Sequence, residues 1–296
     1  MTTLMGEMMV DFVFYILVFL AAMVIGVAGA MAGVGGGVLF TPVMLAFTSF
    51  DINAVRAAGL FLAMGTSAQA GSYYLRKGVA SLPVVLYGAT WMSLGALVGS
   101  LLGLYIVEVF GEFGKAVIRL TLGGTVLGVF FVMFLKKVEW PEARPDRLAQ
   151  MLGLYGRYYE ESLKKEVAYG ARRTLIATFF LFLVGFIGGM FGLGGGWALV
   201  PVYNLVMGLP LKVSVACSSA TLAVGDAPAA WTFLRSGVVD VSLTVAAMGG
   251  VFIGAQLGSY MAMRAKVRVV RYIVLGVMLL SAISLIQRGL SQLGLI

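Results

Sequence analysis

Long apolar runs, repeated along the whole chain, restrict this sequence more than any other feature. Apolar residues make up 60% of the 296 residues and charged residues 11%, whereas a soluble domain carries about 25% charged residues. A soluble fold would leave too many apolar side chains in water, so lipid must cover them. Because one crossing needs roughly 20 apolar residues, the sequence predicts an all-α integral membrane protein. The predicted segments lie at 11–34, 37–49, 54–75, 81–107, 114–135, 174–191, 197–209, 213–234, 240–262 and 269–287.

The two halves of the chain are copies of one repeat. The sequence GVGGG at 33–37 aligns with GLGGG at 192–196, and the same offset of 159 residues pairs Pro42 with Pro201. Glycines shared only through a common composition would not keep one register across so long a stretch. We therefore expect two repeats of about five membrane segments each, in which a short helix follows each glycine break.

The charge pattern predicts how these parts are arranged. Membrane repeat one is expected at 1–135, a charged linker at 136–173 and membrane repeat two at 174–296. Loops rich in Lys and Arg stay on the cytoplasmic side, so the linker is predicted to be cytoplasmic. Five crossings per half then place both termini outside the cell and invert the second repeat. Four crossings per half would place the basic cluster at 264–271 outside, so that alternative is rejected.

The linker itself allows two interpretations. Leu148, Leu152, Tyr155 and Tyr159 recur at helical spacing, which favours a short amphipathic helix within 146–169 at the membrane interface. A solvated loop is the alternative.

Each glycine cluster is expected to interrupt a membrane helix. A break leaves backbone N–H groups unpaired at the start of the next half-helix, where partial positive charge collects. Two such ends meeting near the membrane midplane would form an anion site. Close helix packing is the competing interpretation, and a dinucleotide site is excluded because no βαβ pattern is present. The candidate substrate-binding glycines are Gly35, Gly36, Gly37, Gly194, Gly195 and Gly196.

Polar residues in the third segment of each half are further candidate ligands. Their hydroxyl and amide groups could coordinate an oxyanion, or they could serve the packing of small residues in a membrane. These substrate-binding candidates are Ser67, Gln69, Ser218, Ser219 and Thr221.

Asp226 is the most informative single residue. A carboxylate within a membrane segment is costly and usually functional, so Asp226 is predicted to carry a coupling proton, with a structural ion pair as the alternative. Arg76 and Arg235 are predicted to gate the path or steer anions, although they could instead be snorkelling anchors. Arg56 carries the same ambiguity, and Trp197 is either an interface anchor or a cavity wall.

Other classes of protein lack support in the sequence. The chain has no histidine and one cysteine, which argues against a metal site, a cofactor or a disulfide framework. No catalytic dyad is recognisable, so an enzyme is not expected. The net charge of +8 follows the positive-inside pattern rather than nucleic-acid binding. The expected partners are a small anion and the lipid of the cell membrane.

The paired glycine pattern resembles the sulfite exporter TauE/SafE family. It runs from Gly33 to Pro42 and from Gly192 to Pro201, and the polar stretch at 218–221 is similar to one that this family often has there. The resemblance implies a secondary transporter, with export of small sulfur-containing anions such as sulfite or organosulfonates. Proton coupling is a further hypothesis. An anion channel, or a carrier of other small organic anions, is the alternative.

Overall fold

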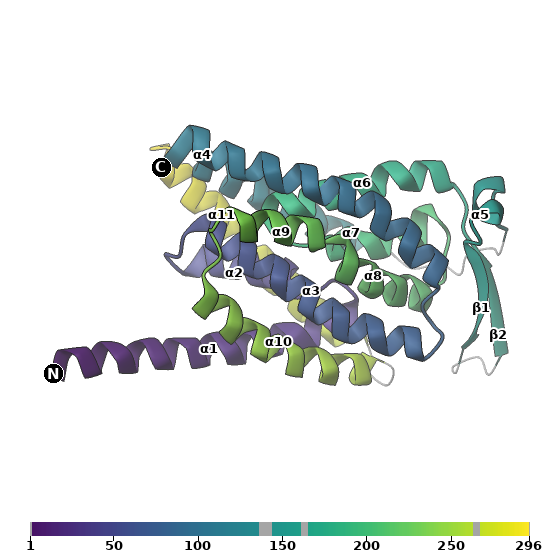
Figure 1. Ribbon diagram of the computed structural model, residues 1–296, viewed down its shortest axis with the longest axis horizontal. Coiled ribbons are helices and arrows are strands. Elements are labelled where there is room, and N and C mark those ends of the chain that lie inside the picture. Colours follow the sequence, from purple (N-terminus) through teal and green to yellow (C-terminus); the bar gives the residue numbers. More distant parts are fainter. Residues whose placement is uncertain (1, 136–143, 161–164, 263–266, 296) are drawn as a thin grey trace.

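The computed structural model describes residues 2–135, 144–160, 165–262 and 267–295. Its long helices lie roughly side by side, with both termini at one end and a β-hairpin at the other (Figure 1). The elements are α1 (Thr2–Ala32), α2 (Gly37–Phe47), α3 (Ile52–Arg76), α4 (Leu82–Leu135), α5 (Arg147–Met151), β1 (Tyr155–Glu160), β2 (Lys165–Gly170), α6 (Thr174–Phe191), α7 (Gly196–Pro201), the π-helical η1 (Val202–Val206), α8 (Leu211–Gly225), α9 (Ala227–Arg235), α10 (Val241–Ala262) and α11 (Val267–Gln292).

The apolar runs form helices, which confirms the predicted all-α membrane class. Helix α4 joins two of the predicted segments, and Gly111, with φ 52° and ψ −126°, separates them at a kink. Within the described ranges, four helices are long and apolar enough to cross a membrane. Their apolar stretches are Val13–Met31, Leu82–Gly128, Thr174–Phe191 and Val241–Met261.

The two halves interlock through glycines that bring helix backbones close together. A Cβ atom added at Gly95 in α4 would lie 2.0 Å from the carbonyl oxygen of Phe182 in α6. In the other half, a Cβ atom at Gly254 in α10 would lie 2.0 Å from the carbonyl oxygen of Met23 in α1. These two contacts differ by 159 residues on both sides (254 − 95 and 182 − 23). Reciprocal contacts of this kind are typical of a two-fold relation. The inversion of the repeats across a membrane stays a prediction.

The linker differs from both sequence interpretations. Helix α5 has only five residues, and β1 and β2 follow it as an antiparallel pair in which Tyr158 lies opposite Val167. The side chains of Tyr158 and Tyr169 are buried against each other, with ring centroids 6.3 Å apart. The prediction of an amphipathic helix over 146–169 was wrong because tyrosine-rich stretches also suit strands, and strand pairing buries these rings.

Asp146 ties the linker to the second repeat. Its carboxylate accepts hydrogen bonds from the N–H of Ala149 at 2.8 Å, and from the N–H and hydroxyl of Thr174 at 2.8 and 2.9 Å. Partial burial alone would raise the pKa of Asp146, but these hydrogen bonds outweigh it and hold the pKa below its ordinary value. The charged carboxylate therefore caps α5 and fixes the start of α6.

The glycine contacts predict a position-dependent cost of adding one methyl group. In Gly99→Ala the new Cβ would lie 1.9 Å from the carbonyl oxygen of Phe186, so α4 and α6 must separate. We expect this variant to lose about 1–3 kcal/mol of stability, seen as a lower melting temperature in detergent. Gly124→Ala, on the same helix, meets nothing within 4 Å and should melt like the wild type. Equal melting temperatures for the two variants would contradict the packing.

The Asp146 cap predicts a pH dependence of stability. Because the folded pKa is lowered, the cap contributes fully at pH values above the ordinary pKa of about 3.9. Its contribution is lost as pH falls through the folded pKa. The difference in melting temperature between wild type and Asp146→Ala should therefore be largest near neutral pH and shrink towards pH 3. A difference that grew on acidification would contradict this sign.

Candidate functional site

Both glycine clusters interrupt helices, as the sequence predicts. Helix α1 ends before Gly33 and α6 ends before Gly192, at the same place in each repeat. Positive φ angles occur in the first break at Gly33 (69°) and Gly35 (74°), and in the second at Gly192 and Gly194 (68° each). Glycine adopts this backbone region at little cost, whereas other residues are strained there. The repeated glycines are thus required by the conformation of the breaks.

Each break is held by a hydroxyl group of the opposite half. Ser218 Oγ donates to the carbonyl oxygen of Gly33 at 2.9 Å, and Thr41 Oγ1 donates to that of Gly192 at 2.7 Å. These bonds satisfy carbonyl groups that a helix end leaves without an intrahelical partner. Neither break is therefore complete within its own repeat.

The two breaks approach each other beside α3. A Cβ atom at Gly37 would lie 2.7 Å from the carbonyl oxygen of Leu193, and one at Gly196 would lie 1.9 Å from that of Val34. The methyl group of Ala63 in α3 lies 3.5 Å from a Cβ position at Gly35 and 2.7 Å from one at Gly194. The starts of α2 and α7 therefore meet in the interior of the protein.

Two repeat-equivalent polar residues face these breaks. Ser67 Oγ lies 3.5 Å from a Cβ position at Gly35, and Asp226 Oδ2 lies 2.7 Å from one at Gly194. Both residues are buried, and neither side chain has a hydrogen-bond partner among the described residues. The N–H of Gly195 approaches the Asp226 carboxylate without reaching hydrogen-bond geometry. Buried polar atoms are rarely left unpaired, so these atoms are candidates for binding a ligand or a proton.

Trp197, which the sequence predicts to be an interface anchor or a cavity wall, carries a third buried polar atom. Its indole Nε1 is buried without a hydrogen-bond partner in the described part of the chain, and it lies in the first turn of α7. Indole nitrogen is a donor only, so it suits an acceptor such as an anion. The position of Trp197 directly after the glycine break was the one sequence signal for a functional role, although a residue at this position could equally serve packing.

The other candidate ligands lie in different surroundings. Ser219 Oγ donates to the carbonyl oxygen of Val215 at 3.1 Å, and the Thr221 hydroxyl is 2.7 Å from the hydroxyl of Tyr203. Gln69 is half-buried. These hydroxyl groups already have protein partners, as has that of Ser218. Their roles in substrate binding stay predictions.

Arg76 and Arg235 lie at exposed helix ends, in the last turns of α3 and α9. Their steering or gating role stays a prediction.

The two breaks enclose polar side chains in the interior of the protein. The Ser67 hydroxyl is a hydrogen-bond donor and Asp226 is a titratable group, and both lie beside the glycine breaks. Asp226 is 0% exposed and Ser67 is 1% exposed, so a ligand reaches them only if the surrounding helices move.

Several apolar helices long enough to cross a membrane, packed around two interior helix breaks, are typical of a multi-pass membrane protein. A model of the family "Sulfite exporter TauE/SafE" matches residues 18–285, and the chain belongs to this family of membrane transporters. It is 25% identical over 284 residues to the "Probable membrane transporter protein YunE" of Bacillus subtilis (strain 168), covering 93% of this chain and 98% of that protein. No solved structure matches the chain.

The geometry of the second break predicts a site-specific effect of one methyl group. In Gly194→Ala the new Cβ would lie 2.7 Å from Asp226 Oδ2, and the residue would also have an unfavourable φ of 68°. Gly237→Ala is the matched control, because its φ is 71° and nothing lies within 4 Å. Both variants should lose about 1–2 kcal/mol of stability from the backbone alone. Only Gly194→Ala should lose transport in proteoliposomes, and comparable transport by the two variants would argue against the site.

Proposed function

We propose that this protein is a secondary transporter that exports small sulfur-containing anions, such as sulfite or organosulfonates, through the site between the two glycine breaks. The observation that carries the proposal is the convergence of both breaks on Ser67 and Asp226. These are the same position in the two repeats, and the polar atoms of both side chains are unpaired.

The starts of the broken helices favour a negatively charged substrate. Helix α2 begins at Gly37, and the apolar helical segment Gly196–Val206 begins at the second break. The first N–H groups of a helix lack intrahelical partners and carry partial positive charge. An oxyanion accepts hydrogen bonds from such groups, as it does from a serine hydroxyl or an indole N–H.

Asp226 supports coupling to protons. Among the described residues it forms no ion pair, and its carboxylate oxygens have no hydrogen-bond partner. An ionised carboxylate buried in this way is costly and would repel an anion. A proton on Asp226 removes both penalties, so we infer that protonation accompanies binding of the anion.

Alternating access through inverted repeats fits this arrangement. The termini and the linker hairpin lie at opposite ends of the molecule (Figure 1), as expected if the linker is cytoplasmic and the termini are outside. Because the site is buried, opening it alternately to the two ends requires one repeat to move against the other. The membership in a transporter family supports such a cycle.

Flux measurements in proteoliposomes test the substrate and the role of Asp226 together. The wild type should move sulfite or organosulfonates faster than carboxylates, at a rate that depends on an imposed pH gradient. Asp226→Asn cannot release a proton, so its rate should become insensitive to the gradient. Asp240→Asn is the matched control, because Asp240 caps α10 through the N–H of Leu243 and Asn caps as well as Asp.

Each outcome bears on a different part of the proposal. Gradient-dependent flux that persists in Asp226→Asn would remove the proton role. Transport of carboxylates alone would show that the substrate class is wrong. Stimulation by substrate on the far side of the membrane indicates a carrier, and its absence would favour a channel.

A further inference from the structure

Arg56 is a fully buried cation that has only neutral partners. Its guanidinium donates to Asn53 Oδ1 at 2.6 Å, to the carbonyl oxygen of Gly103 at 3.3 Å and to that of Met190. Its Cζ lies 5.1 Å from the centre of the Phe233 ring. The Nε–H has no partner among the described residues, and the side chain is 0% exposed.

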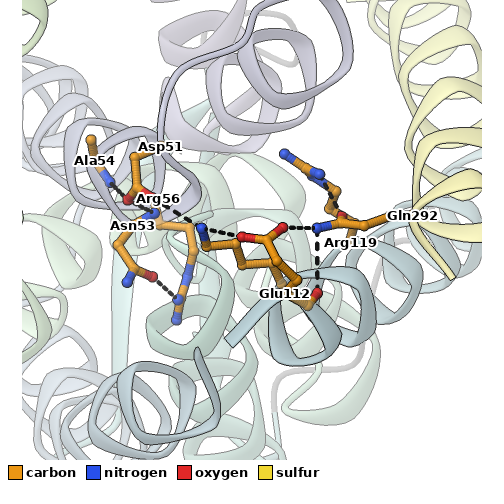
Figure 2. A network of polar contacts seen from close by, with 8 residues as sticks. Asp51, Asn53, Ala54, Arg56, Glu112, Arg119 and Gln292 are labelled. Carbon is orange, nitrogen blue, oxygen red and sulfur yellow. Dashed lines mark hydrogen bonds and ion pairs between the residues drawn. The ribbon is translucent and has the colours of Figure 1, made fainter. Parts of the chain in front are cut away.

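The neighbouring acidic groups are engaged elsewhere. Asp51 accepts hydrogen bonds from the N–H groups of Asn53 and Ala54, and it lies 4.0 Å from Lys115. Lys115 also contacts Glu112, which Gln292 reaches from α11. Figure 2 shows this polar network beside Arg56. In the described part of the chain, Arg56 forms no ion pair. A buried charge without an opposite charge is expensive, which calls for a functional reason.

The position of Arg56 connects it to the central site. Arg56, Gly59, Ala63 and Ser67 are spaced by three, four and four residues, which places them on one face of α3. Along this face, Ser67 and Ala63 contact the first break, and a Cβ atom at Gly59 would lie 2.5 Å from the carbonyl oxygen of Gly192. With a rise of about 1.5 Å per residue, Arg56 lies about 16 Å from Ser67 along the helix.

We propose that Arg56 is a second anion subsite, which holds the transported oxyanion between the glycine breaks and the end of the molecule where both termini lie. This inference rests on the proposed function. Guanidinium groups donate charge-assisted hydrogen bonds to oxyanions, and the Nε–H of Arg56 has no partner among the described residues. The small residues Ser67, Ala63 and Gly59 pack against the glycine breaks on the same face of α3 as Arg56, so a ligand reaches Arg56 from the breaks only when these helices separate.

The subsite exists in one repeat alone. The position equivalent to Arg56 in the second half is Val215, since 56 + 159 is 215. Val215 packs against Gly33, as the backbone of Arg56 packs against Gly192. The backbone contact is thus repeated in the second half, while the buried guanidinium is not.

Transport kinetics in proteoliposomes test the subsite. Arg56→Gln should raise the KM for sulfite by about tenfold or more, as expected when a charged hydrogen-bond donor is lost. Arg56→Lys keeps the charge and should raise the KM less. Arg288→Gln is the matched control, because Arg288 also binds carbonyl groups at a helix end, those of Leu45 and Thr48, but is exposed. Its KM should equal that of the wild type.

A second pair of variants tests the Arg56 subsite if Arg56→Gln does not fold. In Gly103→Ala the new Cβ would lie 2.1 Å from Arg56 Nη2 and 2.8 Å from the carbonyl oxygen of Met190. Gly99→Ala disturbs the contact between the same two helices without touching Arg56. Gly103→Ala should raise the KM for sulfite well above that of Gly99→Ala.

The outcomes separate this inference from the proposed function. If the wild type moves sulfite and the KM is unchanged in Arg56→Gln, or in Gly103→Ala relative to Gly99→Ala, the subsite is overturned and the proposed function stands. If the wild type moves none of the sulfur-containing anions, the proposed function fails and the subsite fails with it.

Discussion

Backbone groups within a bilayer must find partners inside the protein, because lipid offers none. In this protein the requirement is most acute at the two glycine breaks, where α1 and α6 end in the interior. The carbonyl groups of Gly33 and Gly192 are satisfied by Ser218 and Thr41, each from the opposite half. The two repeats therefore depend on each other to satisfy their own backbones, and the breaks are held where they meet.

The two halves can form these hydrogen bonds because their helix backbones lie close together. The glycines of α4 and α10 have no side chain, so they touch backbone carbonyl groups of α6 and α1. In lipid, where no hydrophobic force drives helices together, such close packing holds them. The same backbone framework carries different chemistry in each half. Ser67 corresponds to Asp226 and Arg56 to Val215, so one half supplies the carboxylate and the other the buried cation.

Most of the fold could be predicted from the sequence, whereas the linker could not. Apolar length fixes membrane helices almost regardless of context, and the helices α2, α3 and α10 begin within two residues of the predicted segments. The linker stretch 146–169 was misinterpreted because four apolar residues can show helical spacing by chance. The strands form because β1 and β2 pair with each other, which the spacing of single residues does not reveal. The sequence ranked Asp226 first because a carboxylate within a membrane segment is costly, but it offered no reason to rank Ser67 above Ser218 and Thr221.

The sequence by itself determined that the chain enters a membrane, that it contains one repeat twice and that glycines interrupt each copy. These properties follow from local composition and spacing, which folding does not alter. The tertiary structure alone decided which polar groups remain unpaired. Ser218 finds its partner 185 residues away and Thr41 finds its own 151 residues away, while Asp226 finds none among the described residues. Hydrogen bonds between such distant residues depend on how the two halves interlock.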